Sequence, residues 1–176
     1  MSDRTGSVAA GDDVRLRPLL PADVPAVAEL NDAEVPRVSP LGASGLHALL
    51  PRCDLAVLAE DASGRLAGFV MAIAPGEAYA SVNYGWFEAR GTDHLYVDRI
   101  VTAASHRRRG VGGRLSAAVE ERARATGRAE VTCEVNVRPR NDASLALHAA
   151  LGFVEVGRQD TTGGTITVAL LARPVR

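Results

Sequence analysis

The sequence predicts one α/β (α+β) domain built around a single mixed β-sheet that is flanked by about four helices. Three observations support this. Short apolar stretches with strand-like spacing alternate with segments whose apolar residues recur every three or four positions. Neither an internal repeat nor a linker interrupts them. The 176 residues are enough for one domain with a proper core.

The elements are expected in the order β-α-α-β-β-β-α-β-α-β-β. Polar residues 1–13 are expected to form a disordered leader, and residues 14–176 to form the domain. The expected strands cover residues 14–17, 55–59, 65–74, 94–102, 130–137, 153–158 and 165–171. The expected helices start near Pro21 and near Ser44, and then span residues 110–126 and 141–151. The segment 79–96 holds five of the seven aromatic residues and is expected to be a connection.

The composition argues against several classes of protein. The net charge is −1, which gives no electrostatic reason to expect a nucleic-acid partner. No apolar run approaches the roughly 20 residues that a membrane-spanning helix needs. Because the N-terminus lacks the apolar stretch of a secretory signal, a cytoplasmic location is expected.

The basic and metal-binding residue types narrow the chemistry further. All 20 basic residues are arginines, so the chain offers no lysine for a Schiff base or for a Walker-type phosphate loop. The four histidines and two cysteines are scattered without the spacing of metal ligands, and no metal is expected. A phosphate site in this chain must therefore use backbone amides and arginine.

The segment Arg107-Arg108-Arg109-Gly110-Val111-Gly112-Gly113-Arg114 lies between a predicted strand and a predicted helix. Glycines permit a tight turn and let a ligand approach the backbone closely. The first amides of a helix have no acceptor inside the helix and lie at the positive end of its dipole. This arrangement is typical of a pyrophosphate site, to which the arginines add charge.

Two motifs carry a family resemblance. Arg107-x-x-Gly110-x-Gly112 matches the Arg/Gln-x-x-Gly-x-Gly/Ala signature of the GNAT superfamily of N-acetyltransferases. Asn141-x-x-Ser144-x-x-Leu147-His148-x-x-x-Gly152-Phe153 is similar to the family's Asn-x-x-Ala/Ser-x-x-Phe-Tyr-x-x-x-Gly-Phe. The motifs fall within residues 95–153, and the order of elements extends the likeness to residues 14–172. Residues 96–100 and 133–136 further resemble a bacterial branch of predicted acetyltransferases.

The resemblance implies a sheet with splayed central strands and acetyl-coenzyme A as co-substrate. The phosphate loop would hold the pyrophosphate, the fourth strand would pair with the pantetheine arm, and the start of the last helix would contact the coenzyme nearby. The cofactor residues implied are Ile100, Val101, Thr102, Arg107, Arg108, Arg109, Gly110, Val111, Gly112, Gly113, Asn141 and Ser144. The reaction implied is direct transfer of an acetyl group to a primary amine in a ternary complex.

The acid and base are assigned less directly. Glu134 is the candidate base, because the family often places a catalytic glutamate on this strand, and Asp98 on the neighbouring strand is its rival. Period-2 alternation would put Tyr96, Asp98 and Ile100 on one face. His148 occupies the position of the family's tyrosine, which protonates the leaving thiolate. Each of these side chains could instead have a structural role.

The acceptor is the least determined part. Tyr84, Trp86 and Phe87 are expected to wall an acceptor site for a small-molecule or peptide amine, although they could equally pack under a long loop. Homodimers are common in the family that the chain resembles, and a C-terminal edge strand could support one. The main alternative is a non-catalytic acyl-coenzyme A-binding module that senses or scaffolds.

Overall fold

The computed structural model describes residues 14–176, so the expected leader at 1–13 lies outside the described residues. Seven strands form one sheet in the order β1-β2-β3-β4-β5-β7-β6. Only β4 and β5 pair in parallel, and all other neighbours are antiparallel. The predicted mixed sheet is therefore confirmed. The strands are β1 (Arg15–Pro18), β2 (Leu55–Glu60), β3 (Leu66–Ile73), β4 (His94–Thr102), β5 (Glu130–Arg138), β6 (Val154–Thr161) and β7 (Ile166–Pro174).

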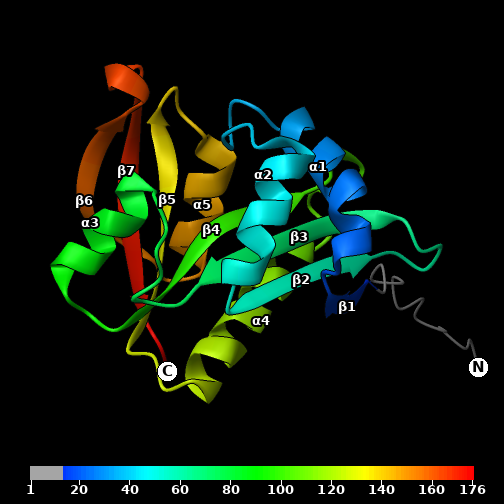
Figure 1. Cartoon of the computed structure of the whole chain (residues 1–176), viewed down its shortest axis with the longest axis horizontal. Coiled ribbons are helices and arrows are strands. Elements are labelled where there is room, and N and C mark those ends of the chain that lie inside the picture. The colour runs from blue at the N-terminus through cyan, green and yellow to red at the C-terminus, as the bar shows by residue number, and fades with distance from the viewer. Residues whose placement is uncertain (1–13) are drawn as a thin grey trace, which may run out of the picture.

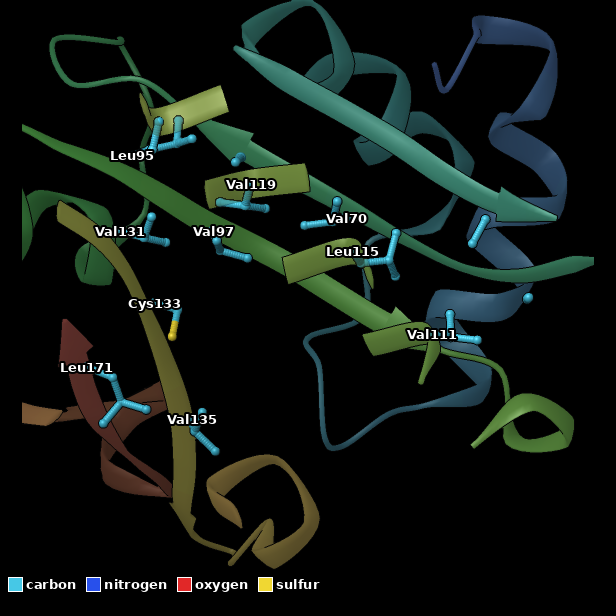
Figure 2. Close-up of a cluster of buried hydrophobic side chains, with 14 of the residues drawn as sticks. Val70, Leu95, Val97, Val111, Leu115, Val119, Val131, Cys133, Val135 and Leu171 are labelled. Atoms are coloured by element: carbon cyan, nitrogen blue, oxygen red, sulfur yellow. The ribbon is translucent and has the colours of Figure 1, made fainter. Parts of the chain in front are cut away.

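Helices cover both faces of the sheet (Figure 1). They are α1 (Val24–Ala33), α2 (Gly42–Leu49), α3 (Val82–Arg90), α4 (Val111–Ala125) and α5 (Asp142–Ala150). One core cluster joins the sheet to α1, α2 and α3. The other joins it to α4 and α5, and Figure 2 shows Val111, Leu115 and Val119 of α4 packed over Val70 and Val97. We call these the α1–α3 face and the α4–α5 face.

Helix α3 was not predicted, since its segment was taken for a connection. Its boundaries nevertheless carry ordinary signals in the sequence. The Ser81 hydroxyl accepts a hydrogen bond from the Tyr84 amide at 3.3 Å, which caps the first turn. Gly91 ends the helix with φ 76°, a conformation that glycine adopts without strain. Five α-helices rather than about four therefore lie within residues 14–176.

The two central strands separate part-way along their length (Figure 1). Pairing between β4 and β5 covers only His94–Val97 against Glu130–Cys133, after which the strands diverge. On its other side β4 pairs with β3, and there the register passes from Arg99 directly to Val97. Asp98 is thus an extra residue, a β-bulge, at the point where the strands part. We call this opening the fork.

The bulge overturns one expectation about side-chain direction. Tyr96 packs in the cluster of the α1–α3 face, whereas Ile100 packs against the cluster of the α4–α5 face. Strict alternation would have kept Tyr96, Asp98 and Ile100 on one face. The extra residue shifts the alternation by one, so the assignment of Ile100 to that face was wrong. Beyond the bulge, Arg99 and Val101 are the buried positions.

Candidate active site

A cavity of about 800 Å³ opens in the fork. Its walls come from the diverging halves of β4 and β5, the start of α4, the start of α5 and the turn between β6 and β7. The segment between α1 and α2, residues 34–40, also lines it, and we call this segment the roof loop. The cavity therefore joins segments from most of the length of the described chain.

One end of the cavity is formed by the main chain at the start of α4. Gly110 precedes the helix with φ 80°, and the Arg114 amide makes the first helical bond, to the Gly110 carbonyl, at 3.0 Å. The amides of residues 111–113 therefore have no acceptor inside the helix. Arg108 also has a positive φ, 61°, and successive amides in such a turn converge on a shared point. This end is chemically suited to a pyrophosphate.

Close approach to this end depends on Gly112. A Cβ atom at Gly112 would lie 3.1 Å from Leu147 Cδ2 and 3.6 Å from Thr102 Oγ1. No side chain fits there without displacing one wall of the cavity. Glycine at this position keeps open the passage between the start of α4 and the start of α5.

The structure brings nearly all of the predicted coenzyme residues to this cavity. Beyond Val97 the edge of β4 that faces β5 has no strand partner, so its main chain can pair with a ligand. Asn141 caps α5, its Oδ1 accepting from the Ser144 amide at 3.3 Å. Arg109 does not line the cavity. The predicted residues that do line it are Ile100, Val101, Thr102, Arg107, Arg108, Gly110, Val111, Gly112, Gly113, Asn141 and Ser144.

The side chain of Arg107 is bonded to the roof loop. Its guanidinium donates to the Glu34 carboxylate, and Arg37 contacts the same carboxylate at 3.3 Å. Glu34 is buried although it is charged, which the two arginines make tolerable. Local spacing does not predict this contact, because Glu34 and Arg107 are far apart in the chain.

Glu134 lies at the fork, immediately after Cys133, the last residue of β5 that pairs with β4. The Tyr96 hydroxyl donates to its carboxylate at 2.8 Å. Removal from water, reinforced by the negative charge of Asp98, raises the pKa of Glu134 to about 8. The carboxyl group is therefore a much stronger proton acceptor than an exposed glutamate, once it is ionised.

Asp98 faces the fork from the other strand, and its side chain is 6% exposed. The Tyr79 hydroxyl donates to its Oδ1 at 2.7 Å, and Arg99 Nε lies 3.1 Å from its Oδ2. Burial raises the pKa of Asp98, while Arg99 and Tyr79 partly offset that effect. Both predicted carboxylates thus line one cavity.

The two faces of the sheet divide the cavity. Cys133 and Val135 of β5 pack in the cluster of the α4–α5 face, so Glu134 and Asn136 point to the α1–α3 face. Asn136 Nδ2 accordingly donates to the Pro36 carbonyl in the roof loop at 3.1 Å. Helix α4 lies on the opposite face. A ligand reaching through the fork would present its end to Glu134.

His148 lines the cavity from α5, on the α4–α5 face. Its ring packs edge-on against Phe153 with centroids 5.2 Å apart, and its Nδ1 lies 2.8 Å from the Ser144 carbonyl. Burial lowers the pKa of His148. In the neutral ring, an N–H at Nδ1 bonded to Ser144 leaves Nε2 without a proton. Its assignment as the acid stays a prediction, and this geometry weighs against it.

The three aromatic residues expected at the acceptor do not line the cavity. Tyr84 and Phe87 are 2% and 1% exposed and belong to the core. Trp86 packs against β6, where a Cβ at Gly157 would come within 2.6 Å of its ring. Because the segment is a helix, these side chains anchor it to the sheet. The neighbouring Asn83 lines the cavity instead.

Several lining residues were not anticipated. They come from the roof loop, from α3, from β4 and the turn after it, from β5, from α5 and from the β6–β7 hairpin, and only the prolines of the roof loop indicated a loop there. The lining residues that were not predicted as site residues are Glu34, Val35, Pro36, Arg37, Val38, Ser39, Pro40, Asn83, Val97, Arg99, His106, Cys133, Val135, Asn136, Ala143, Leu147, Thr161, Thr162, Ile166 and Val168.

Within residues 14–176, no group of three or more histidine, cysteine, aspartate or glutamate side chains could hold a metal ion. In the same range, no helix combines the length and the apolarity needed to cross a membrane.

Comparisons with solved structures show the fold. The ribosomal-protein-S18-alanine N-acetyltransferase from Escherichia coli superposes with a TM-score of 0.70 and 18% identity over 93% of this chain and 94% of that one. NAA60 from Arabidopsis thaliana, solved with a bisubstrate analogue, superposes with a TM-score of 0.72 and 17% identity over 92% of this chain and 98% of that one. A GNAT-family acetyltransferase from Streptococcus pneumoniae superposes with a TM-score of 0.67 and 23% identity over 93% of this chain and 100% of that one.

No curated protein matches the sequence. The profile described as "Acetyltransferase (GNAT) family" matches residues 25–153, a span that runs from α1 through the phosphate-binding turn to the end of α5. It includes both motifs and both carboxylates of the fork. This chain belongs to the GNAT acetyltransferase family.

Proposed function

We propose that this protein transfers the acetyl group of acetyl-coenzyme A to a primary amine, directly, in a ternary complex. One observation supports this above all. A single cavity connects the unpaired amides at the start of α4 with a buried carboxyl group of raised pKa, and it does so through the fork. Coenzyme binding and proton removal would then take place in one space.

The residues present fit the coenzyme. The amides of residues 111–113 and the turn at Arg108 would hold the pyrophosphate, and Gly112 leaves the space for it. The unpaired edge of β4 would bond the extended arm as a neighbouring strand would. When bound, acetyl-coenzyme A supplies the thioester carbonyl that the amine attacks. The protein holds the two reactants together, and proximity alone can provide much of the rate.

Glu134 would act on the amine. Amines are mostly protonated near neutral pH, and only the uncharged form is nucleophilic. Glu134 points to the α1–α3 face, opposite the phosphate-binding helix, where an amine can enter. With a pKa of about 8, its carboxylate can take a proton from an ammonium group more readily than an ordinary glutamate can. Tyr96 orients that carboxylate by donating to it.

The leaving thiolate needs less help. A coenzyme A thiolate is a fairly good leaving group, so its protonation adds less to the rate than removal of the amine proton. His148 lies in the last turn of α5, and its only N–H in the neutral state points to the Ser144 carbonyl. Water or His148 can deliver this proton.

The test is an acetyl-coenzyme A turnover screen with thiol detection across polyamines, amino acids, aminoglycosides and peptide N-termini. We expect thiol release with at least one amine class and acetylation of its nitrogen by mass spectrometry. Tight acetyl-coenzyme A binding without release by any amine would favour the alternative, a non-catalytic acyl-coenzyme A sensor or scaffold. Binding of ATP or NAD in preference to acetyl-coenzyme A would contradict both.

A further inference from the structure

The part of the cavity on the α1–α3 face has a distinct charge, and we call it the acceptor half. It is bounded by the roof loop, by Asn83 of α3, by Asp98, Glu134 and Asn136 at the fork, and by residues 161–168 of the β6–β7 hairpin. Two of these side chains are acids, and each accepts a hydrogen bond from a tyrosine hydroxyl. The chemistry of this half follows from whether any cation faces those acids.

Arg99 lies beside these acids, and its charge is already paired with one of them. It is buried, with 5% exposure. Its Nη1 donates to Asn31 Oδ1 at 2.9 Å and to the Ser39 carbonyl at 2.8 Å, and its Nη2 donates to Ser39 Oγ at 2.9 Å. Its Nε lies 3.1 Å from Asp98 Oδ2. The guanidinium thus ties α1 and the roof loop to β4 and forms an ion pair with Asp98.

The other arginines that line the cavity are Arg37, Arg107 and Arg108. Arg37 belongs to the roof loop and pairs with Glu34, and the same carboxylate accepts from Arg107 of the phosphate loop. Arg108 is in the phosphate loop as well. Of these three, only Arg37 borders the acceptor half, and its charge is paired with an acid.

The histidines are directed elsewhere too. His106 contacts Asp61 through Nε2 at 3.1 Å and Ser105 through Nδ1 at 2.9 Å, just before the phosphate loop. His148 is on the opposite face, bonded to Ser144. Among the described residues that line the cavity, the two arginines that border the acceptor half, Arg37 and Arg99, are each paired with an acid.

The remaining walls of the acceptor half are largely apolar. Val35 and Val38 of the roof loop and Ile166 and Val168 of β7 all line the cavity. They come from two separate elements. An acceptor with an apolar body would make apolar contacts in this half while its amine reaches the fork.

Resting on the proposed function, we propose that the acceptor is a primary amine with an apolar body and no carboxylate, which excludes free amino acids. An ammonium group entering this half meets Asp98 and Glu134. A carboxylate beside that ammonium would lie against the same two acids, and the two arginines that border this half, Arg37 and Arg99, are already paired with acids. Like charges so placed in a buried site are strongly unfavourable.

The experiment compares matched acceptors that differ only in the carboxyl group. The pairs are L-phenylalaninamide against L-phenylalanine and L-leucinamide against L-leucine, with 2-phenylethylamine as the amine that lacks the group altogether. We measure kcat/KM with saturating acetyl-coenzyme A, expressed per concentration of uncharged amine. We expect each amide to exceed its acid by on the order of 100-fold or more.

A variant that adds a cation to this half tests the cause. Thr161 lines the cavity at the end of β6, and Thr161→Arg should narrow the amide-to-acid ratio of kcat/KM at least about tenfold relative to Thr161→Gln, an uncharged polar control. The ratio is compared within each variant, so a general loss of rate does not affect it.

The outcomes separate the two proposals. Acids used as well as amides would overturn this inference and leave the acetyltransferase proposal standing. If no amine releases thiol, the acetyltransferase proposal fails, and calorimetry of the same probes with the coenzyme A-bound protein tests the preference for an amine without a carboxylate. Binding of the amino-acid amides without binding of the amino acids would support that preference. Equal binding of both, or no binding of either, would contradict it.

Discussion

The two ends of the cavity use different parts of the chain. At the phosphate end the binding groups are main-chain amides, presented by a turn and by the start of α4. At the fork the groups are side chains, Glu134 and Asp98, whose properties depend on Tyr96, Tyr79 and the bulge in β4. A site built from main-chain amides should tolerate the loss of a nearby side chain but not a larger side chain that fills the space for the ligand. A site built from side chains should lose its function when one of its functional groups is replaced, even by a group of the same size.

The largest effect is expected at the fork. Glu134→Gln keeps the shape of the side chain but removes its ability to accept a proton, and turnover should fall by ~10²–10⁴-fold. Acetyl-coenzyme A affinity, measured by calorimetry, should stay nearly unchanged. Wild-type turnover should rise with pH through about 8, because Glu134 must lose its proton before it can act. That rise should be missing in Glu134→Gln, and a variant with wild-type turnover would show that the base lies elsewhere, with Asp98→Asn as the next test.

At the phosphate end, space should matter most. Gly112→Val would drive a side chain into Leu147 and Thr102, so acetyl-coenzyme A affinity should drop by at least about 100-fold. Gly85→Ala is the matched control, because it is also a helical glycine and a Cβ there meets nothing within 4 Å. Calorimetry and circular dichroism would be measured together. Unchanged affinity in a folded Gly112→Val protein would remove the coenzyme from this loop.

The pKa of Glu134 can be moved in both directions by its neighbours. Asp98→Asn removes a nearby negative charge, which should lower the pKa and shift the acidic limb of the pH–rate profile to lower pH. Tyr96→Phe removes the hydrogen bond that stabilises the carboxylate, which should raise the pKa and shift the limb to higher pH. Shifts in the same direction would mean that the limb reports a group other than Glu134.

A side-chain change at the phosphate end should cost little. Arg107→Ala removes a guanidinium that is paired with Glu34, while the amides of α4 stay in place. We expect acetyl-coenzyme A affinity to fall no more than about tenfold, as for the loss of one charge-assisted bond. An effect as large as that of Gly112→Val would show that the arginine side chain, not the main chain, carries the phosphate contact.

The smallest effect on turnover is expected at His148. His148→Ala should reduce the turnover number less than about tenfold but lower the melting temperature by about 4–8 °C, because it leaves a hole beside Phe153. Kinetics at saturating substrate and a thermal melt would be recorded for Ala and Tyr at this position. A stable alanine variant that loses turnover and regains it as His148→Tyr would restore the acid role that the sequence motif implies.

The sequence by itself brought together the residues at the phosphate end. The spacing of Gly110 and Gly112, their place between a strand and a helix, and the second motif at Asn141 were enough to predict residues that line this end of the cavity, and coenzyme binding there stays a prediction. The reason is physical, since a main-chain site is built from residues next to one another in the chain. The strands, four of the helices and the mixed sheet followed from local periodicity in the same way.

Only the tertiary structure decided the acceptor half. The bulge at Asp98 depends on pairing with β3, and the pKa of Glu134 is raised by its burial in the folded protein and then by the charge of Asp98 from another strand. Because their segment forms helix α3, Tyr84, Trp86 and Phe87 pack against the core on the α1–α3 face. The Arg99 guanidinium is hydrogen-bonded to Asn31 and Ser39. These facts depend on contacts between residues distant in sequence, and local spacing carries no information about which distant side chains will meet.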